Sequence, residues 1–216
     1  MPRFCGCGKV NSIDHALICM KGGYVSMRHN NLRDAEARFM EEICKDVAIE
    51  PVLLPTDEEQ THGNTAERAR LDISARGVWG GCEKTFFDVR VCHPNSDSYL
   101  NKSMEAIYAD HENQKKRDYN DRVIHTERAS FTPLVFTTTG GMGPECQKLN
   151  KRLAEKISNK RKESYSSVIT HLRRRLRFAL LKATLVAVRG FRGKTPSQEE
   201  EIVDISFNLI PQAKVD

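Results

Sequence analysis

Two runs of alternating apolar and polar residues, 71–76 and 86–91, flank the glycine-rich segment 77–81. An alternation with period two is typical of β-strands, and glycines allow the positive φ angles of a tight turn. The stretch therefore predicts a β-hairpin with its turn centred near Gly80. In antiparallel register about that centre, Asp72 lies directly opposite Asp88.

Two facing carboxylates would repel each other, because side chains that face across a strand pair have Cβ atoms roughly 5 Å apart. A divalent cation relieves that repulsion, and carboxylate oxygens are the ligands that Mg²⁺ prefers. The hairpin therefore suggests a magnesium site at Asp72 and Asp88. The alternative is an amphipathic hairpin whose two aspartates simply face solvent.

Elsewhere, apolar residues recur at helical spacing and predict four helices. The first begins at an N-cap of Asn30 or Asn31 and is ended by Pro51, and the others cover about 102–125, 144–162 and 165–189. Residues 130–139 predict one more strand. The apolar stripes of the first and last helices consist of Leu32, Ala35, Phe39, Ile43 and Val47, and of Val168, Leu172, Leu176, Leu180 and Leu185.

Two ionisable side chains lie on the apolar stripes of these helices. Glu36 lies on the stripe of the first helix, and Lys115 lies in the middle of the stripe of the second. A buried carboxylate is costly unless it is paired, so Glu36 either keeps its carboxylate in water or joins Asp72 and Asp88 at a metal. Lys115 either snorkels to solvent or holds its ammonium near the carboxylates.

Composition adds limits to this picture. The chain has 216 residues, of which 39% are hydrophobic and 29% are charged, as expected for one globular domain with appendages. No apolar run is long enough for a bilayer span, and the N-terminus lacks a signal-peptide pattern, so we expect a soluble, intracellular protein. The segment 57–67 predicts a mobile loop beside the hairpin, and 193–216 predicts a polar tail.

Seven cysteines are an odd number with uneven spacing, which favours metal binding over a disulfide framework. Cys5, Cys7, His15 and Cys19 supply three thiolates and one imidazole, enough for a closed tetrahedral zinc site. His15 and Cys19 are four residues apart and would share one face of a short helix. We interpret the cluster as a zinc knuckle rather than unrelated free cysteines, and we interpret Cys44, Cys82, Cys92 and Cys146 as small buried side chains.

The formal net charge is only +5, but the C-terminal third is much more basic than the rest. A basic helix face is often just solvated surface. Two successive helices biased to one sign favour a polyanionic partner. The last helix carries four arginines for such a partner, Arg173, Arg174, Arg175 and Arg177.

The order of these motifs resembles the restriction-like endonuclease domain of site-specific non-LTR retrotransposon polyproteins, a member of the PD-(D/E)xK nuclease superfamily. The residues that carry the resemblance are the zinc knuckle, the triplet 28–30 (Arg-His-Asn), Asp72, Asp88 and the helix with Lys115 and Tyr119. It covers roughly residues 5–160. The resemblance implies a restriction-endonuclease-like α/β fold, in which helices flank a small mixed sheet with a central hairpin.

The resemblance also implies a function and partners. Such domains nick target DNA next to a reverse transcriptase, so it implies a nuclear protein that binds DNA, with RNA and a reverse transcriptase as further partners. It adds Arg28 and His29 to the nucleic-acid-binding residues. No reverse transcriptase motif is present, and the sequence leaves open whether the chain is a complete protein. The domain boundaries we expect are a knuckle at 1–24, a nuclease-like core at 25–162, a basic helix at 163–192 and a tail at 193–216.

The chain departs from the superfamily pattern at two positions. Leu71 replaces the usual proline, and Arg90 replaces the lysine expected two residues after the second acid. Arginine remains protonated, so Arg90 can stabilise charge but cannot act as a base, and Lys115 is the candidate for a relocated lysine. Two hypotheses follow: an endonuclease with catalytic Mg²⁺ or Mn²⁺ and structural Zn²⁺, or a nucleic-acid-binding module whose catalytic site has decayed.

Overall fold

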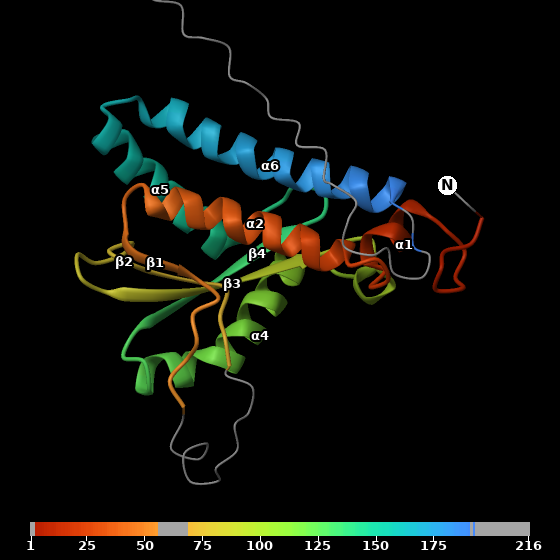
Figure 1. Cartoon of the computed structure of the whole chain (residues 1–216), viewed down its shortest axis with the longest axis horizontal. Coiled ribbons are helices and arrows are strands. Elements are labelled where there is room, and N and C mark those ends of the chain that lie inside the picture. The colour runs from red at the N-terminus through yellow and green to blue at the C-terminus, as the bar shows by residue number, and fades with distance from the viewer. Residues whose placement is uncertain (1–2, 56–68, 191, 193–216) are drawn as a thin grey trace, which may run out of the picture.

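The computed structural model describes residues 3–55, 69–190 and 192. The predicted loop at 57–67 and the predicted tail at 193–216 lie outside these residues. The chain is a mixed α/β protein built on one four-stranded sheet (Figure 1). Its strands are β1 (Lys45–Ile49), β2 (Ile73–Arg76), β3 (Lys84–Cys92) and β4 (Ser130–Thr137). Its helices are α1 (Ile13–Ile18), α2 (Tyr24–Glu41), the 3₁₀ turn η1 (Asp97–Tyr99), α4 (Met104–His125), α5 (Pro144–Arg161) and α6 (Tyr165–Arg189).

The strands follow the order β1-β2-β3-β4, with the first two pairs antiparallel and β3–β4 parallel. Strands β2 and β3 form the predicted hairpin, and their pairs run from Ile73–Phe87 to Arg76–Lys84, which confirms a turn centred near Gly80. The ladder ends at Ile73, the residue that follows Asp72 in the sequence. The N–H of Asp72 donates to Phe87 O at 3.2 Å, so the backbone is irregular there. Asp72 and Asp88 are therefore not a pair of the β2–β3 ladder, contrary to the prediction that they lie directly opposite each other.

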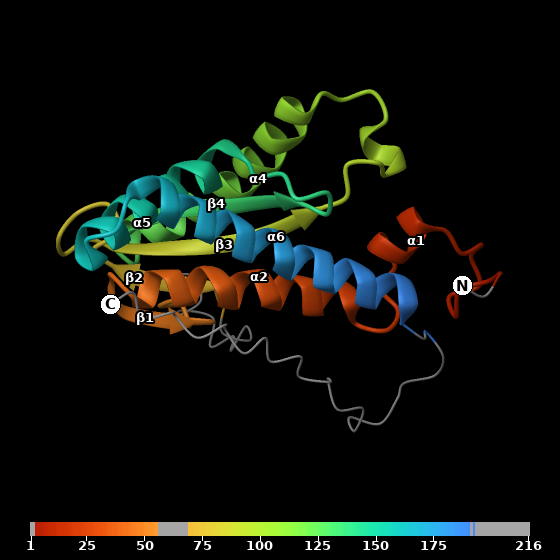
Figure 2. The same cartoon turned by 90° about the horizontal axis from the view of Figure 1, so that it is seen from above.

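Helices cover both faces of the sheet (Figure 2). One face packs Phe87 and Val89 against α2, α5 and α6, where the largest apolar cluster lies. The other face packs Phe86 against Val123 of α4, and Cys92 against Ile107 of α4. Because both faces are covered, most of β3 is buried and the alternation of its residues does not separate core from solvent.

The first predicted helix is wrong at both ends. Helix α2 begins after Gly23, which has a φ of 71°, so Asn30 and Asn31 lie inside the helix. It ends at Glu41, and residues 45–49 form β1 on the edge of the sheet instead of continuing the helix. The helical period extended through Ile43 and Val47, but pairing with β2 overrides that local preference.

The later elements agree with the sequence. Helix α6 has the predicted bounds, and α4, α5 and β4 differ from prediction by one or two residues at an end. Three details differ from prediction. Leu185 is 46% exposed because Ala183 and Ala187 complete the buried face of α6, Cys82 is exposed in the hairpin turn, and Cys44 is only half-buried. None of the described helices is both long and apolar enough to cross a membrane.

Candidate functional site

Asp88 lies in the middle of β3, on the face that α4 covers. Its Oδ2 is 2.7 Å from Nζ of Lys115, and both side chains are largely buried. Lys115 reaches this position because it lies on the inward stripe of α4, where its ammonium also lies 5.4 Å from the centre of the Tyr119 ring. The structure thus brings the predicted lysine to the second of the two predicted acids.

The pKa of Asp88 is raised above its ordinary value. Burial is the main cause, the nearby Lys115 ammonium opposes it, and the negative charge of Asp72 raises the pKa further. The two aspartates therefore interact electrostatically although Asp72 lies beyond the end of β2. Burial and the charge of Asp72 both disfavour the ionised form of Asp88, so a bound cation would stabilise that form.

Asp72 is held by two groups at the end of the hairpin. Its Oδ2 accepts the backbone N–H of Val89 at 2.6 Å and lies 3.1 Å from Nε2 of His29. The same Nε2 lies 3.0 Å from the carbonyl oxygen of Val89, so the imidazole sits between two oxygen acceptors. The hydrogen bond to Asp72 raises the pKa of His29.

The sequence indicated only a nucleic-acid-binding role for His29 and did not reveal its hydrogen bond with Asp72. Its neighbour Arg28 was placed in the same role, but it is only 3% exposed and its Nη2 donates to Leu17 O at 3.0 Å. Arg28 therefore joins α2 to α1 inside the protein. Two residues one position apart on a helix point in directions about 100° apart, which separates their roles.

Glu36 does not join the two aspartates. It lies in α2 on the opposite face of the sheet from Asp88, where its Oε1 accepts a hydrogen bond from Nδ2 of Asn150 in α5 at 2.9 Å. The carboxyl is completely buried, and burial raises its pKa to about 7. The helical stripe correctly placed Glu36 inside the protein, but it could not say on which side of the sheet.

Arg90 lies two residues beyond Asp88 on the same face of β3 and is exposed. Its positive charge is one reason why the pKa of His111 in α4 is lowered, after burial. His111 Nε2 is 2.8 Å from the hydroxyl of Tyr99, a hydrogen bond that the sequence did not reveal. The Asp88–Lys115 pair and the Arg90–His111 neighbourhood thus lie side by side between β3 and α4.

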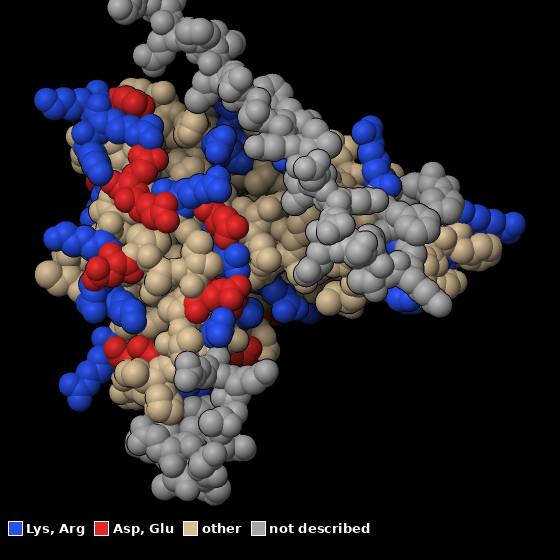
Figure 3. All heavy atoms as spheres, viewed as in Figure 1, with Lys and Arg blue, Asp and Glu red and all other residues tan. Residues whose placement is uncertain are grey.

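The basic residues of the two C-terminal helices differ in their surroundings. In α5, Lys156 donates to Gly77 O, Arg152 pairs with Glu155 and Arg161 pairs with Glu42, so these charges are used within the protein. Figure 3 shows acidic side chains interspersed among basic ones over the left-hand end of the molecule, as such pairing requires.

The arginines of α6 are different. All four predicted arginines are exposed. No carboxylate of the described residues lies within 4.0 Å of the basic groups of Arg173, Arg174, Arg175 and Arg177. These four charges thus have no carboxylate partner among the described residues, and the polyanionic partner stays a prediction.

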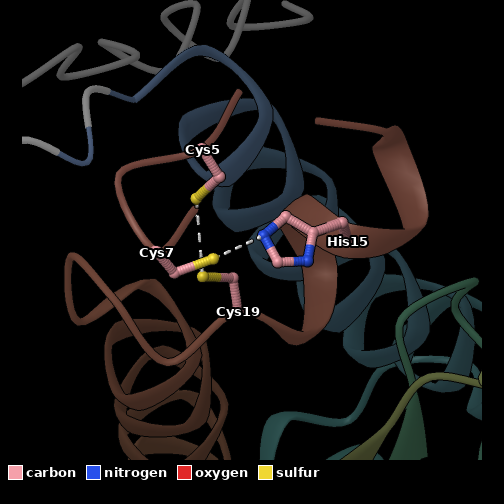
Figure 4. Close-up of side chains that lie close together, drawn as sticks. All are labelled: Cys5, Cys7, His15 and Cys19. Atoms are coloured by element: carbon pink, nitrogen blue, oxygen red, sulfur yellow. Dashed lines mark hydrogen bonds between the residues drawn. The ribbon is translucent and has the colours of Figure 1, made fainter. Parts of the chain in front are cut away.

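Four side chains near the N-terminus form a separate cluster, shown in Figure 4. The nitrogen and sulfur atoms of Cys5, Cys7, His15 and Cys19 all lie within 4.8 Å of one another. The Sγ atoms of Cys5 and Cys19 are 3.7 Å apart, and Cys7 Sγ is 3.2 Å from His15 Nε2. Two sulfurs on a tetrahedral zinc ion with bonds of about 2.3 Å are separated by roughly 3.8 Å, so this geometry fits zinc.

Local structure explains how the cluster forms. The predicted short helix is α1, capped by Ser12, whose Oγ accepts the N–H of His15 at 3.0 Å. The helix places His15 and Cys19 one turn apart, while a turn from Cys5 to Lys9 brings Cys5 and Cys7 opposite them (Figure 4). Within the described residues, this is the one group of three or more Cys, His, Asp or Glu side chains that lie close enough to hold a metal ion.

The segment that carries the Cys/His cluster is fixed to the end of the sheet. His93, directly after β3, has Nε2 2.9 Å from Asp14 Oδ1 and Nδ1 2.7 Å from the hydroxyl of Thr138, directly after β4. Arg192, after α6, donates to Ala16 O at 2.9 Å. No sequence pattern singled out His93 or Arg192, because neither lies on a periodic stripe.

Comparison with known proteins adds no assignment: no model of a known protein family matches the sequence, and no curated protein matches it.

Proposed function

We propose that the chain is a metal-dependent endonuclease that nicks DNA, with its catalytic centre at Asp72, Asp88 and Lys115. The observation that carries the proposal is the ion pair between Lys115 and Asp88 on the central strand, next to a second carboxylate at the end of the neighbouring strand. A mixed sheet with a central hairpin and helices on both faces is also what the resemblance to restriction-like endonucleases implies.

The donor set suits a hard divalent ion. Asp72 and Asp88 each use Oδ2 within the protein, and Oδ1 of neither accepts a hydrogen bond from a described residue. Two carboxylate oxygens match the preference of Mg²⁺ and Mn²⁺. Such an ion would supply Lewis-acid polarisation of the phosphate and a bound water of lowered pKa.

The remaining chemistry belongs to side chains of the protein. The ammonium of Lys115 lies next to Asp88, where it would stabilise the negative charge that develops on the phosphate. The guanidinium of Arg90 would hold the phosphate from the open end of the same face. The buried environment between β3 and α4 strengthens the interaction of Lys115 relative to water, whereas Arg90 acts from the exposed end.

A second candidate is a nucleic-acid-binding module without catalysis. Two observations favour it: Arg90 replaces the usual lysine, and both aspartates are already paired with cationic or N–H groups of the protein. On this reading the zinc cluster and the arginines of α6 carry binding, and the acids stabilise the hairpin.

A nicking assay on supercoiled DNA with Mg²⁺ or Mn²⁺ separates the two candidates. The endonuclease predicts nicking by the wild type, none by Asp88→Asn, and a roughly 10²-fold slower rate for Lys115→Met, as for loss of one group that stabilises transition-state charge. Lys116→Met is the matched control, because Lys116 is the next residue of α4 but pairs with Glu145 at 2.6 Å. Binding of DNA with no nicking in either metal would favour the module.

A further inference from the structure

The outward face of α6 carries a stripe of large apolar side chains. Phe178, Leu181 and Leu185 are 60%, 52% and 46% exposed. Their spacing of three and four residues places them on one side of the helix, opposite the buried side that includes Leu176 and Leu180. Single exposed apolar residues are ordinary, but three on one face of an outer helix form a patch of the kind that binds another segment.

The same helix is strongly basic. Helix α6 contains no Asp or Glu, and its basic residues are Arg173, Arg174, Arg175, Arg177, Lys182 and Arg189. Arg174 lies one turn before Phe178 on the same side of the helix, and Arg177 lies directly before Phe178 beside the stripe. Figure 2 shows α6 on the outside of the layers, so both the stripe and the arginines are open to a partner.

The charge of α6 argues against a second copy of the chain on this face. In a twofold dimer the same surface patch meets itself, so two helices with six basic residues each and no acidic residue would face one another. Repulsion between like charges in an interface opposes such a pairing. The face instead suits a partner that is both acidic and apolar.

One segment of the chain has that chemistry. Residues 199–210 read EEEIVDISFNLI, with four acidic residues and six apolar ones. They lie outside the described residues, and they follow α6 in the chain. Residues 173 and 189 of α6 are separated by roughly 24 Å along the helix. The chain from residue 192, just beyond the end of α6, to residue 199 spans up to roughly 24 Å when extended, so the acidic triplet can reach the arginines.

We propose that residues 199–210 dock on the outward face of α6, with Glu199, Glu200 and Glu201 against the arginines and the following apolar residues on Phe178, Leu181 and Leu185. Docking removes apolar surface from water and gives carboxylate partners to the arginines. It also places carboxylates where phosphates of a nucleic acid would bind. The segment therefore competes with nucleic acid for α6, a consequence that rests on the proposed function, whereas the docking itself does not.

A photo-crosslinking group tests the docking in the full-length chain. p-Benzoylphenylalanine at position 181 should form crosslinks within one molecule to peptides from 199–210, identified by mass spectrometry on material of monomer mass. The same group at position 124 is the control, because Ile124 is 50% exposed on α4, away from α6. Crosslinks between two molecules, or no crosslink to 199–210, would overturn the proposal.

Charge substitutions test which residues hold the segment. The substitutions Glu199→Arg, Glu200→Arg and Glu201→Arg together should abolish the crosslink from position 181. Adding Arg173→Glu, Arg174→Glu and Arg175→Glu should restore it, because the opposite charges are exchanged. If the first set leaves the crosslink intact, charge pairing with the acidic triplet is refuted.

A binding measurement tests the competition separately. The triple change to Gln at residues 199–201 should bind DNA more tightly than a control with the same change in net charge. That control replaces three exposed acidic residues away from α6 with their amides, Glu83, Glu105 and Asp121. Equal affinities of the two variants, together with an intact crosslink, would refute the competition but leave the docking in place. A variant that binds DNA more tightly yet is inactive as a nuclease would refute only the proposed function.

Discussion

The buried carboxyl of Glu36 makes a sharp prediction about stability and pH. It is completely buried between α2 and α5, and burial raises its pKa from 4.5 to about 7. Its Oε1 accepts a hydrogen bond from Asn150 at 2.9 Å and a long one from the thiol of Cys146 at 4.0 Å. Its Oε2 has no hydrogen-bond partner among the described residues. The folded state therefore holds the proton of this carboxyl more tightly than the unfolded state does.

The sign of the effect follows from proton linkage. At a pH well below 4.5, both states carry the proton and Glu36 costs nothing through ionisation. Between 4.5 and 7, the unfolded state releases the proton while the folded state keeps it, so the free energy of unfolding falls as pH rises. Each pKa unit corresponds to about 1.4 kcal/mol, so the whole loss is about 3 kcal/mol and is complete above about pH 7.

The substitution Glu36→Gln removes this titration and keeps an oxygen for Asn150 Nδ2. Urea unfolding of the two proteins at several pH values gives the difference in their free energies of unfolding. We expect the variant to gain roughly 2–3 kcal/mol relative to the wild type between about pH 5 and pH 8. Other titrating groups, such as Asp88, contribute equally to both proteins and cancel in the difference.

Glu41→Gln is the control, because it makes the same chemical change at an exposed carboxyl at the end of the same helix. The measurement also separates Glu36 from the proposed metal site at Asp72 and Asp88, because Mg²⁺ should leave the pH dependence of the difference unchanged. A difference for Glu36→Gln that does not vary with pH would refute the reasoning from burial. A strong effect of Mg²⁺ would indicate that Glu36 binds the metal together with Asp72 and Asp88.

Three further predictions concern the other sites. The purified protein should contain about one zinc ion by elemental analysis, and zinc-free wild-type protein would contradict the site. Cys19→Ser should lose the zinc and unfold the N-terminal segment while the sheet remains folded. Replacement of residues 173–175 of α6 by alanine should weaken binding to all nucleic-acid sequences alike. The slope of log K against log salt concentration should become shallower by roughly 0.9 for each phosphate that is no longer neutralised, whereas an unchanged slope would identify a merely solvated face. Mg²⁺ should raise the melting temperature of the wild type more than that of Asp88→Asn, and equal rises would place the metal elsewhere.

The parts of the fold that the sequence predicted well are those set by local signals. Helix α6 is capped by Ser164, ends at Gly190 and carries a regular apolar stripe, so its bounds could be read directly. The glycines of the hairpin turn likewise indicated its centre. The Cys/His cluster was predictable because its four members lie within fifteen residues of one another in the sequence, and the structure confirms that they lie close enough to hold a metal ion.

The parts that failed depend on tertiary pairing. Residues 45–49 continue the helical period of α2, yet they form β1 because β2 offers an edge for pairing. At Asp72 the backbone leaves the regular ladder, and Leu71 packs on the face opposite to that of Ile73, so the strict alternation of the sequence was misleading there. No local signal marks such an irregularity.

Glu36 and Lys115 show why a site can be only half predicted from periodicity. Each lies on the inward stripe of a helix, and the structure places each side chain inside the protein as the stripe requires. Lys115 reaches Asp88 because α4 covers the same face of β3 as that carboxylate. Glu36 faces Asn150 instead, because α2 packs on the other side of the sheet. Periodicity decides whether a side chain points inward, whereas the connections between strands decide which face of the sheet its helix covers. A candidate site assembled from helical stripes therefore needs the topology before its members can be brought together.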